Sequence, residues 1–370
     1  MKMKKVVALG AAVGVALAGL GLALPANAEP VSNGYVLVGS DTLQDSTNAL
    51  LNGTSVGGAP VRVTSAGTSL GSFDAFGSTA IQTKTGGAYF GRPAGSGAGV
   101  TALRASITGN TYTGNAAVPA RVITGQVDIA RSSSGAGSNA NTNGLLAYVP
   151  YGRDAVAYAY NGTNSDLAAL TTAQLKQIYE SNTPVTIGST VVKPRIPQSS
   201  SGTRSFFLSA IGVTTLGTTV GDSTANTTPE NDASILGADE IIPFSAASWV
   251  AQANGVTGVN TIAAASAVNV KLGSPNGVAP FTGTGTSLVP NSTFYNAAPF
   301  GRDTYLVVEY ARINSSDAKY DANLANLLDP SKTQSLTNTG TFASTTGAVK
   351  RKFGFLAPSS TTIIRAYATL

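Results

Sequence analysis

Four short clusters of glycine and hydroxyl residues carry the clearest chemical signal in this sequence. A helix N-terminus presents free main-chain N–H groups and the positive end of its dipole, and both attract anions. Glycine permits close approach of the backbone, hydroxyls add neutral donors, and arginine adds a planar fork that suits phosphate-like oxygens. Each cluster alone is typical of a helix cap, but together they predict a site for a small tetrahedral oxyanion. The clusters are Ser40-Asp41-Thr42-Leu43, Gly95-Ser96-Gly97-Ala98-Gly99, Arg131-Ser132-Ser133 and Ser201-Gly202-Thr203-Arg204.

The residue types that are absent narrow the chemistry further. The sequence contains no His and no Cys, which excludes a Ser-His-Asp triad and a thiol nucleophile. Zinc, copper and haem sites lose their usual ligands for the same reason. We therefore expect no catalytic residues, no metal site and no cofactor. A secreted hydrolase that uses serine with lysine or acidic residues remains as the enzyme alternative.

The N-terminus has the pattern of a secretory signal. Lys2, Lys4 and Lys5 precede an apolar run over 6–24, and Pro25-Ala26-Asn27-Ala28 offers the small residues that signal peptidases recognise. We expect cleavage after Ala28 and a secreted protein, located outside the cell, at its surface or in a periplasm. A retained membrane anchor is the alternative for this segment. No later run reaches the ~20 apolar residues of a membrane-spanning helix, so the mature chain is not expected to span a membrane.

The charge balance gives no indication of a nucleic-acid partner. The chain has 23 Lys and Arg residues against 18 Asp and Glu residues, and three of the lysines lie in the segment that we expect to be removed. The remaining excess is too small to favour nucleic acid. Without Cys no disulfide can form, so an exported chain must be stabilised by its packed core. The length is sufficient for about two domains.

Strand-like and helix-like segments alternate along the chain. This alternation predicts an α/β fold with largely parallel sheets. The expected strands are 34–38, 60–64, 127–130, 155–160, 241–244 and 304–310, and the expected helices are 43–51, 100–106, 167–179, 206–211, 245–253 and 321–328.

The order of these segments resembles the phosphate-binding proteins of ABC importers, which have the type II periplasmic-binding-protein fold. The segment 39–43 resembles the family's first ligand loop, 95–99 its Gly-Ser-x-Gly-Gly loop, and 200–203 its Gly-Ser-Gly-Thr segment. The segment 170–179 is similar to its Leu-Thr-x-x-Gln-Leu-x-x-Ile-Tyr helix. The likeness is collinear over about residues 34–330.

The resemblance implies a set of ligand-binding residues. They are the hydroxyl and amide of Thr42, the amide of Leu43, Ser96, Ser201, Gly202 and Thr203. Two positions depart from the family pattern. The aspartate that accepts a proton from hydrogen phosphate falls on Ser133, which we keep in the predicted site, and the ligand arginine falls on Pro197.

Other residues are candidates to replace these two groups. Arg131, Arg195 and Arg204 could supply the missing positive charge; Arg131 is preferred, and Arg204 is also included in the predicted site. Asp41 could restore an acceptor, although a helix-capping role is the preferred interpretation. We interpret 230–232 as an ordinary loop, with contact to the rim of the cleft as its alternative, and 350–352 as a solvated turn.

The family fold implies two lobes, each a mostly parallel sheet flanked by helices, with a ligand cleft between them. We expect lobe I at 29–158 plus 304–370 and lobe II at 159–303. The leading hypothesis is a secreted solute-binding protein that captures phosphate or a similar oxyanion without catalysis, with an ABC permease as a possible partner. The alternative is a cell-surface or extracellular-matrix protein that retains this fold and has lost transport function.

Overall fold

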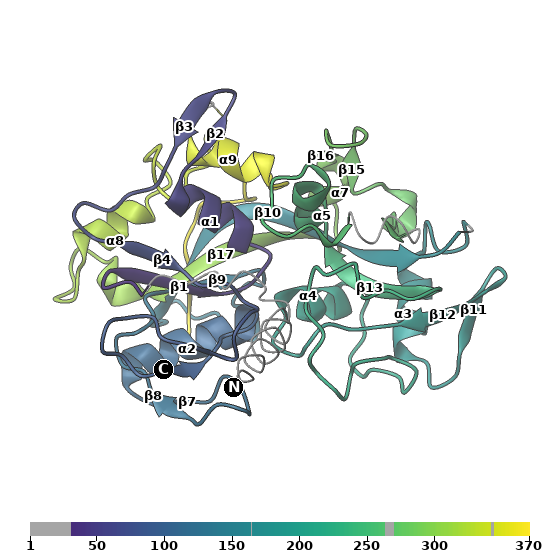
Figure 1. The fold of residues 1–370 in the computed structure, drawn as a ribbon, viewed down its shortest axis with the longest axis horizontal. Coiled ribbons are helices and arrows are strands. Elements are labelled where there is room, and N and C mark those ends of the chain that lie inside the picture. Colours follow the sequence, from purple (N-terminus) through teal and green to yellow (C-terminus); the bar gives the residue numbers. More distant parts are fainter. Residues whose placement is uncertain (1–30, 164, 263–269, 342–343) are drawn as a thin grey trace, which may run out of the picture. The chain divides into compact units, whose positions relative to one another are not determined.

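A long antiparallel pair of strands, β10 (Leu146–Asn161) and β17 (Gly301–Glu309), forms the centre of the structure (Figure 1). The computed structural model describes residues 31–163, 165–262, 270–341 and 344–370. The expected signal segment and its cleavage site at Ala28 lie outside the described residues. Within them, no helix is long and apolar enough to cross a membrane.

The described residues contain a ten-stranded sheet in the order β11-β12-β13-β10-β17-β9-β1-β4, and β14 and β18 also pair with β10. Its other strands are β1 (Tyr35–Gly39), β4 (Leu70–Ser72), β9 (Ile129–Ser132), β11 (Val185–Ile187), β12 (Thr190–Pro194), β13 (Glu240–Ser245), β14 (Val270–Leu272) and β18 (Ile364–Ala366). Four two-stranded ribbons are β2–β3 (Thr54–Val56, Ala59–Val61), β5–β6 (Ala80–Ile81, Phe90–Gly91), β7–β8 (Thr111–Tyr112, Arg121–Val122) and β15–β16 (Phe281–Thr282, Val289–Pro290).

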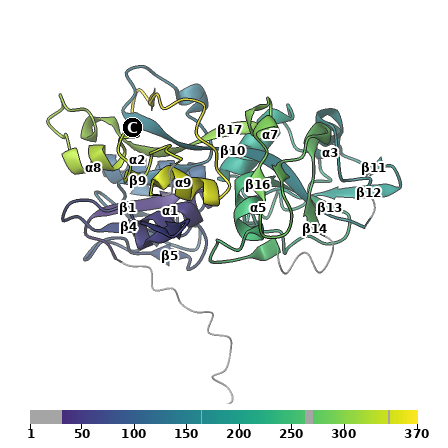
Figure 2. The ribbon, with the colours of Figure 1, turned by 90° about the horizontal axis from the view of Figure 1, so that it is seen from above.

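The helices cover both faces of this sheet (Figures 1 and 2). They are α1 (Gln44–Asn52), α2 (Ser96–Thr108), α3 (Thr172–Glu180), α4 (Gly202–Ala210), α5 (Ala246–Ala253), α7 (Ser292–Asn296), α8 (Ala322–Leu327) and α9 (Thr346–Lys352).

Strand β1 shows why the expected apolar run forms a strand that is buried on both faces. Tyr35 and Leu37 belong to the apolar cluster that includes α1 and α9, whereas Val36 and Val38 belong to the cluster that includes α2. Successive side chains of a strand point to opposite faces of the sheet. A strand covered by helices on both sides therefore has an unbroken apolar sequence rather than an alternating one.

Apolar clusters divide along the two central strands. One cluster consists of residues between 155 and 300, around α3, α4, α5 and β13. Two others combine residues from before 152 with residues from after 304, and one of these also includes Ala247 and Ala251 of α5. The lobe boundaries at 158/159 and 303/304 stay a prediction.

The sheet is mixed, which corrects the expectation of mostly parallel sheets. Strand β1 pairs in parallel with β4 and β9, and β12 with β13. Every partner of β10 is antiparallel to it. The sequence-based expectation treated 155–160 as an ordinary short strand. It is instead the end of a 16-residue strand, which pairs with β13, β14, β17 and β18 at different points along its length.

The same tripeptide, Gly-Arg-Asp, occurs in both central strands. Because β10 and β17 are antiparallel, Asp154 lies opposite Arg302, and Arg153 lies opposite Asp303. Both cross-strand pairs are ion pairs, at 2.7 Å for Asp154–Arg302 and 3.0 Å for Arg153–Asp303. The Asp154–Arg302 pair is almost completely buried, and it holds a positive charge at the centre of the sheet.

The expected solvated turn at 350–352 is wrong for Lys350. These residues end α9, and the Lys350 side chain is buried against Tyr151. Its Nζ donates to the carbonyl oxygens of Tyr151 at 2.5 Å and Leu336 at 3.2 Å. Burial lowers the pKa of the Lys350 ammonium from 10.5 to about 7, because a charged amine loses its hydration inside the protein.

The buried Lys350 should make the free energy of unfolding of the protein depend on pH. Between pH 7 and 9 the unfolded chain binds a proton at this lysine that the folded chain has lost, so the free energy of unfolding should rise with pH. The expected slope approaches about 1.4 kcal/mol per pH unit. Urea unfolding of the wild type and of Lys350→Met, followed by the fluorescence of the single Trp249, should show this slope only in the wild type. The exposed Lys332→Met serves as the control and should retain it.

The buried ion pair generates a second prediction. The substitution Asp154→Asn leaves the Arg302 guanidinium buried without its counter-charge, and breaking a buried pair in this way costs about 3–5 kcal/mol. The matched control is Glu180→Gln, which breaks the exposed Lys176–Glu180 pair of α3 and should cost about 0.5 kcal/mol or less. Equal losses in urea unfolding would show that Asp154 does not stabilise the core.

Candidate functional site

Close packing of two glycines brings α2 against the end of β1. Gly39 has a φ of 108°, and a Cβ on it would lie 2.6 Å from the Arg131 carbonyl oxygen and 3.2 Å from the Gly99 Cα. A Cβ on Gly99 would in turn lie 2.6 Å from the Gly39 Cα. Only glycine permits both the backbone conformation and this approach. The first turn of α2 therefore lies beside the loop that contains Thr42.

The structure brings three of the predicted site residues into direct contact. Ser96 and Ser133 share a hydrogen bond between their hydroxyls at 3.1 Å, and the Ser133 main-chain N–H donates to Ser96 Oγ at 2.9 Å. A Cβ on Gly202 would lie 2.4 Å from each of these hydroxyl oxygens. The N-terminus of α4 thus packs directly on the N-terminus of α2, and all three residues are buried.

The first turn of α4 is built by hydroxyl residues. Ser201 caps the helix, since its Oγ accepts from the Arg204 main-chain N–H at 3.0 Å. Thr203 is fully buried, and its Oγ1 accepts from Arg302 Nη2 at 3.0 Å. Ser201, Gly202 and Thr203 therefore combine a helix N-terminus, two hydroxyls and an adjacent guanidinium, which is the donor set that an oxyanion needs.

Arg302 is the functional residue that the sequence analysis missed. Its Nε and Nη2 donate to Asp154 Oδ2 at 3.0 and 2.7 Å. Asp154 also accepts from Ser245 Oγ and the Ala247 main-chain N–H, both at 3.0 Å. Arg302 Nη1 is buried and has no hydrogen-bond partner among the described residues. A buried guanidinium with an unused donor beside a helix N-terminus is suited to bind an anion.

A signal for Arg302 was nevertheless present in the sequence. The repeated tripeptide, residues 152–154 and 301–303, directly precedes each of the two expected strands at 155–160 and 304–310. Charged residues of opposite order on two strands form reciprocal pairs when the strands are antiparallel. The expectation of largely parallel sheets concealed this pairing.

Glu230 also lies in the site rather than in an ordinary loop at its rim. It is only 2% exposed, and its Oε2 accepts from the Ser201 hydroxyl and, at 3.1 Å, from the Thr203 main-chain N–H. Within the described part of the chain, its other oxygen, Oε1, has no hydrogen-bond partner. The carboxylate thus occupies donors at the N-terminus of α4.

A second carboxyl group, that of Asp41, lies near Glu230. Burial, and next the nearby carboxyl of Glu230, raises the pKa of Asp41 well above its usual value. Asn231 Nδ2 donates to Asp41 Oδ2 at 3.1 Å and to Thr42 Oγ1 at 3.2 Å. The preferred interpretation of Asp41 as a helix cap is wrong, because α1 has no side-chain cap and its N-cap residue is Leu43.

The arginines that the sequence analysis considered have other partners. Arg131 is fully buried, and its donors go to Ser40 O at 3.0 Å, Ser72 Oγ at 2.6 Å and Phe73 O at 2.6 Å. Burial lowers the pKa of Arg131 to about 10, which leaves it charged at neutral pH.

The remaining two arginine candidates lie on the loop before α4 and on α4 itself. Arg204 Nη1 donates back to Pro197 O at 2.9 Å. Arg195 forms ion pairs with Asp222 at 2.6 Å and Glu240 at 3.3 Å. Of the arginines that the sequence analysis named, none has a hydrogen bond to Thr203 in the described residues. That position belongs to Arg302.

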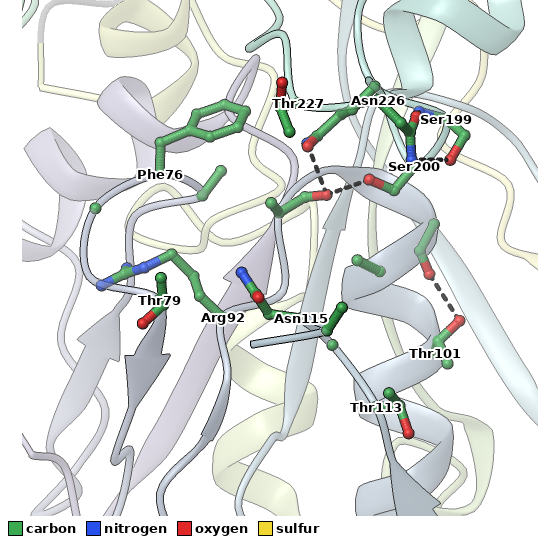
Figure 3. Close-up of a pocket in the computed structure, with 18 of the residues that line it drawn as sticks. Phe76, Thr79, Arg92, Thr101, Thr113, Asn115, Ser199, Ser200, Asn226 and Thr227 are labelled. Atoms are coloured by element: carbon green, nitrogen blue, oxygen red, sulfur yellow. Dashed lines mark hydrogen bonds between the residues drawn. The ribbon is translucent and has the colours of Figure 1, made fainter. Parts of the chain in front are cut away.

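A pocket of about 770 Å³ lies beside these helix N-termini. Figure 3 shows Phe76, Thr79 and Arg92 on one side of it and Ser199, Ser200 and Asn226 on the other. The Gly97 main-chain N–H donates to Ser200 O at 3.1 Å, so the α2 and α4 loops meet at this pocket. The wall at 225–227 belongs to the same loop as Glu230, which does not itself line the pocket.

Comparison with known proteins followed from this geometry. A search of the curated proteins finds no match. Solved structures match throughout the fold at low identity. An ABC-type phosphate transport receptor from Vibrio cholerae is 14% identical, with 88% of this chain and 100% of that chain covered and a TM-score of 0.50.

Two further structures show the same likeness. A putative phosphate ABC transporter substrate-binding protein from Clostridium perfringens is 14% identical, with 77% and 89% covered and a TM-score of 0.45. A possible phosphate-binding protein from Planctomyces limnophilus is 12% identical, with 88% and 97% covered and a TM-score of 0.39.

The expected fold class, an α/β fold of the type II periplasmic-binding-protein kind, is confirmed. The model of the PBP superfamily domain matches residues 53–325. Because this match spans most of the chain, the protein belongs to the PBP superfamily.

Proposed function

We propose that this protein is a secreted solute-binding protein that captures a small tetrahedral oxyanion, with phosphate as the first candidate, and does not transform it. The oxyanion would lie where the N-termini of α2 and α4 meet, between two lobes at 29–158 plus 304–370 and 159–303. The Vibrio cholerae relative is described as a phosphate transport receptor, which makes phosphate the first ligand to test.

The observation that carries this proposal is the Arg302 guanidinium. It is 3% exposed, its Nη2 contacts Thr203 in the first turn of α4, and its Nη1 has no partner among the described residues. An unsatisfied buried donor costs free energy, and an oxyanion bound at this helix N-terminus would satisfy it. We therefore assign the cationic role to Arg302 in place of Arg131.

The other ligand contacts follow from the same geometry. Ser96, Ser133, Ser201, Gly202 and Thr203 supply hydroxyls and main-chain N–H groups. We expect the hydroxyl of Thr42 and the main-chain N–H of Leu43 to complete the site from the loop after β1. Arg204 lies in the first turn of α4, where its main-chain N–H donates to the Ser201 hydroxyl and holds that residue in place.

Binding without chemistry fits the side chains present. His and Cys are absent from the sequence, and the seryl hydroxyls of the site contact one another or Glu230 rather than a basic group. Export after cleavage at Ala28 would place the protein outside the membrane, where an ABC permease is its expected partner.

Calorimetric titration tests this function. We expect saturable one-to-one binding of phosphate to the purified protein. Thr203→Val removes the hydroxyl that contacts Arg302 and a hydrogen bond to an anion, and such bonds contribute about 1.5–3 kcal/mol. The substitution should therefore weaken binding by about tenfold or more. Sulfate, titrated in parallel, measures selectivity between the two anions.

Ser205→Ala is the matched control. Ser205 is exposed on the same helix, and its hydroxyl donates only to Ser201 O, so this variant should bind like the wild type. If folded wild-type protein gives no heat with phosphate or sulfate, and removal of Glu230 restores none, the oxyanion proposal fails. A cell-surface or matrix protein that has kept the fold without transport then becomes the better description.

A further inference from the structure

Glu230 holds a carboxylate at the position where a bound anion would satisfy α4. The Ser201 hydroxyl and the Thr203 main-chain N–H both donate to its Oε2, and these are groups that an oxyanion would use. Helix α4 has nine residues. The unpartnered and buried Arg302 Nη1 is a second, independent sign that an anion belongs beside its first turn.

We propose that Glu230 is an internal substitute for the oxyanion: its carboxylate occupies the α4 end of the anion site in the ligand-free protein, and the ligand binds by displacing it. This inference rests on the oxyanion-binding function proposed above. It assigns to Glu230 the role of setting which anions are able to enter and how tightly they bind.

The neighbouring groups of the site already have hydrogen-bond partners within the protein, which supports a site occupied by the Glu230 carboxylate. Ser96 and Ser133 bond to each other, and Gly202 packs on both hydroxyls. The donors at the N-terminus of α4 are satisfied by Glu230. Arg302 Nη1 is the donor of this group that has no partner among the described residues.

Displacement requires the side chain of Glu230 to move while its backbone can stay in place. Asn231 anchors the main chain, because its Oδ1 accepts from the Ser245 main-chain N–H at 2.9 Å and its carbonyl from Gln252 Nε2 at 3.0 Å. A glutamate has three rotatable side-chain bonds. The loop that contains it also lines the pocket of Figure 3, at 225–227.

The charged groups around Glu230 determine which anions can displace its carboxylate. Asp41 lies against it from the loop after β1, Arg131 from β9 is near Asp41, and Arg302 from β17 is held by Asp154 from β10. Arg204 stands on α4 itself. The carboxyl groups of Asp41 and Glu230 therefore oppose an incoming anion, and the nearby guanidinium groups attract it.

The substitution Glu230→Gln tests the proposal. It keeps the side chain's size and one acceptor oxygen but removes the charge that competes with the ligand. Like-charge repulsion at close range is a strong penalty, so calorimetry at pH 7.5 should show phosphate binding tightened by about tenfold or more. Asp239→Asn removes a carboxylate from a half-buried position of the same loop, directly before β13, and should leave the affinity unchanged.

A second measurement uses the wild type and does not depend on the variant folding. Sulfate keeps its charge between pH 5 and 8, whereas the Asp41 carboxyl beside Glu230 takes up a proton more readily than an ordinary aspartate, because burial and the Glu230 carboxyl raise its pKa. Sulfate should therefore bind the wild type more tightly at pH 5 than at pH 8. In Glu230→Gln this dependence should flatten.

The outcomes separate this inference from the proposed function. Phosphate binding to the wild type that tightens by about tenfold or more in Glu230→Gln supports both. Binding to the wild type that is unchanged or weakened in folded Glu230→Gln overturns the inference and leaves the oxyanion function standing, since Glu230 would then assist the ligand. Binding to neither protein, with both folded by Trp249 fluorescence, overturns both.

Discussion

The buried pair between Asp154 and Arg302 is the interaction on which the rest of the site depends. Burial of two charges is costly, and the cost is offset only when hydrogen bonds satisfy the carboxylate and the geometry is good. Here Asp154 accepts from Arg302 twice, from Ser245 and from the N-terminus of α5. One carboxylate therefore joins β10, β17 and α5, and it aims the guanidinium at Thr203.

The clusters at the helix ends can meet around that guanidinium because their residues are small. Gly39 and Gly99 allow α2 to touch the end of β1, and Gly202 allows α4 to touch Ser96 and Ser133. Any side chain at these three positions would separate the helix ends by the width of a methyl group. The many glycines and hydroxyl residues of this chain thus have a geometric role: they let main-chain donors from distant segments approach one point.

The sequence predicted those parts of the site that are local and failed at those created by pairing across the sheet. The strand–loop–helix order and the Ser201 cap follow from short-range rules of turn and cap chemistry, and Ser96, Ser133 and Gly202 do meet. Arg302 escaped detection because its partner is 148 residues away and its strand was expected as 304–310. Glu230 escaped because only a folded chain shows that its loop enters the site. Parallel pairing was over-predicted for the same reason, since strand direction is a property of the assembled sheet.

A site designed to hold a desolvated anion faces a difficulty when it is empty. Donors that are directed at one point and shielded from water lose their hydrogen bonds to water, and without an acceptor this loss costs free energy. A protein can meet this requirement by opening its cleft to water or by supplying an acceptor of its own. The second solution is the one proposed here, because the Glu230 carboxylate accepts from the Ser201 hydroxyl and the Thr203 main-chain N–H in the first turn of α4. The internal acceptor stabilises the closed form, and the same contacts set the threshold that a ligand must exceed. The Glu230 carboxylate therefore has two opposite effects: it stabilises the ligand-free protein, and it lowers the affinity for the ligand.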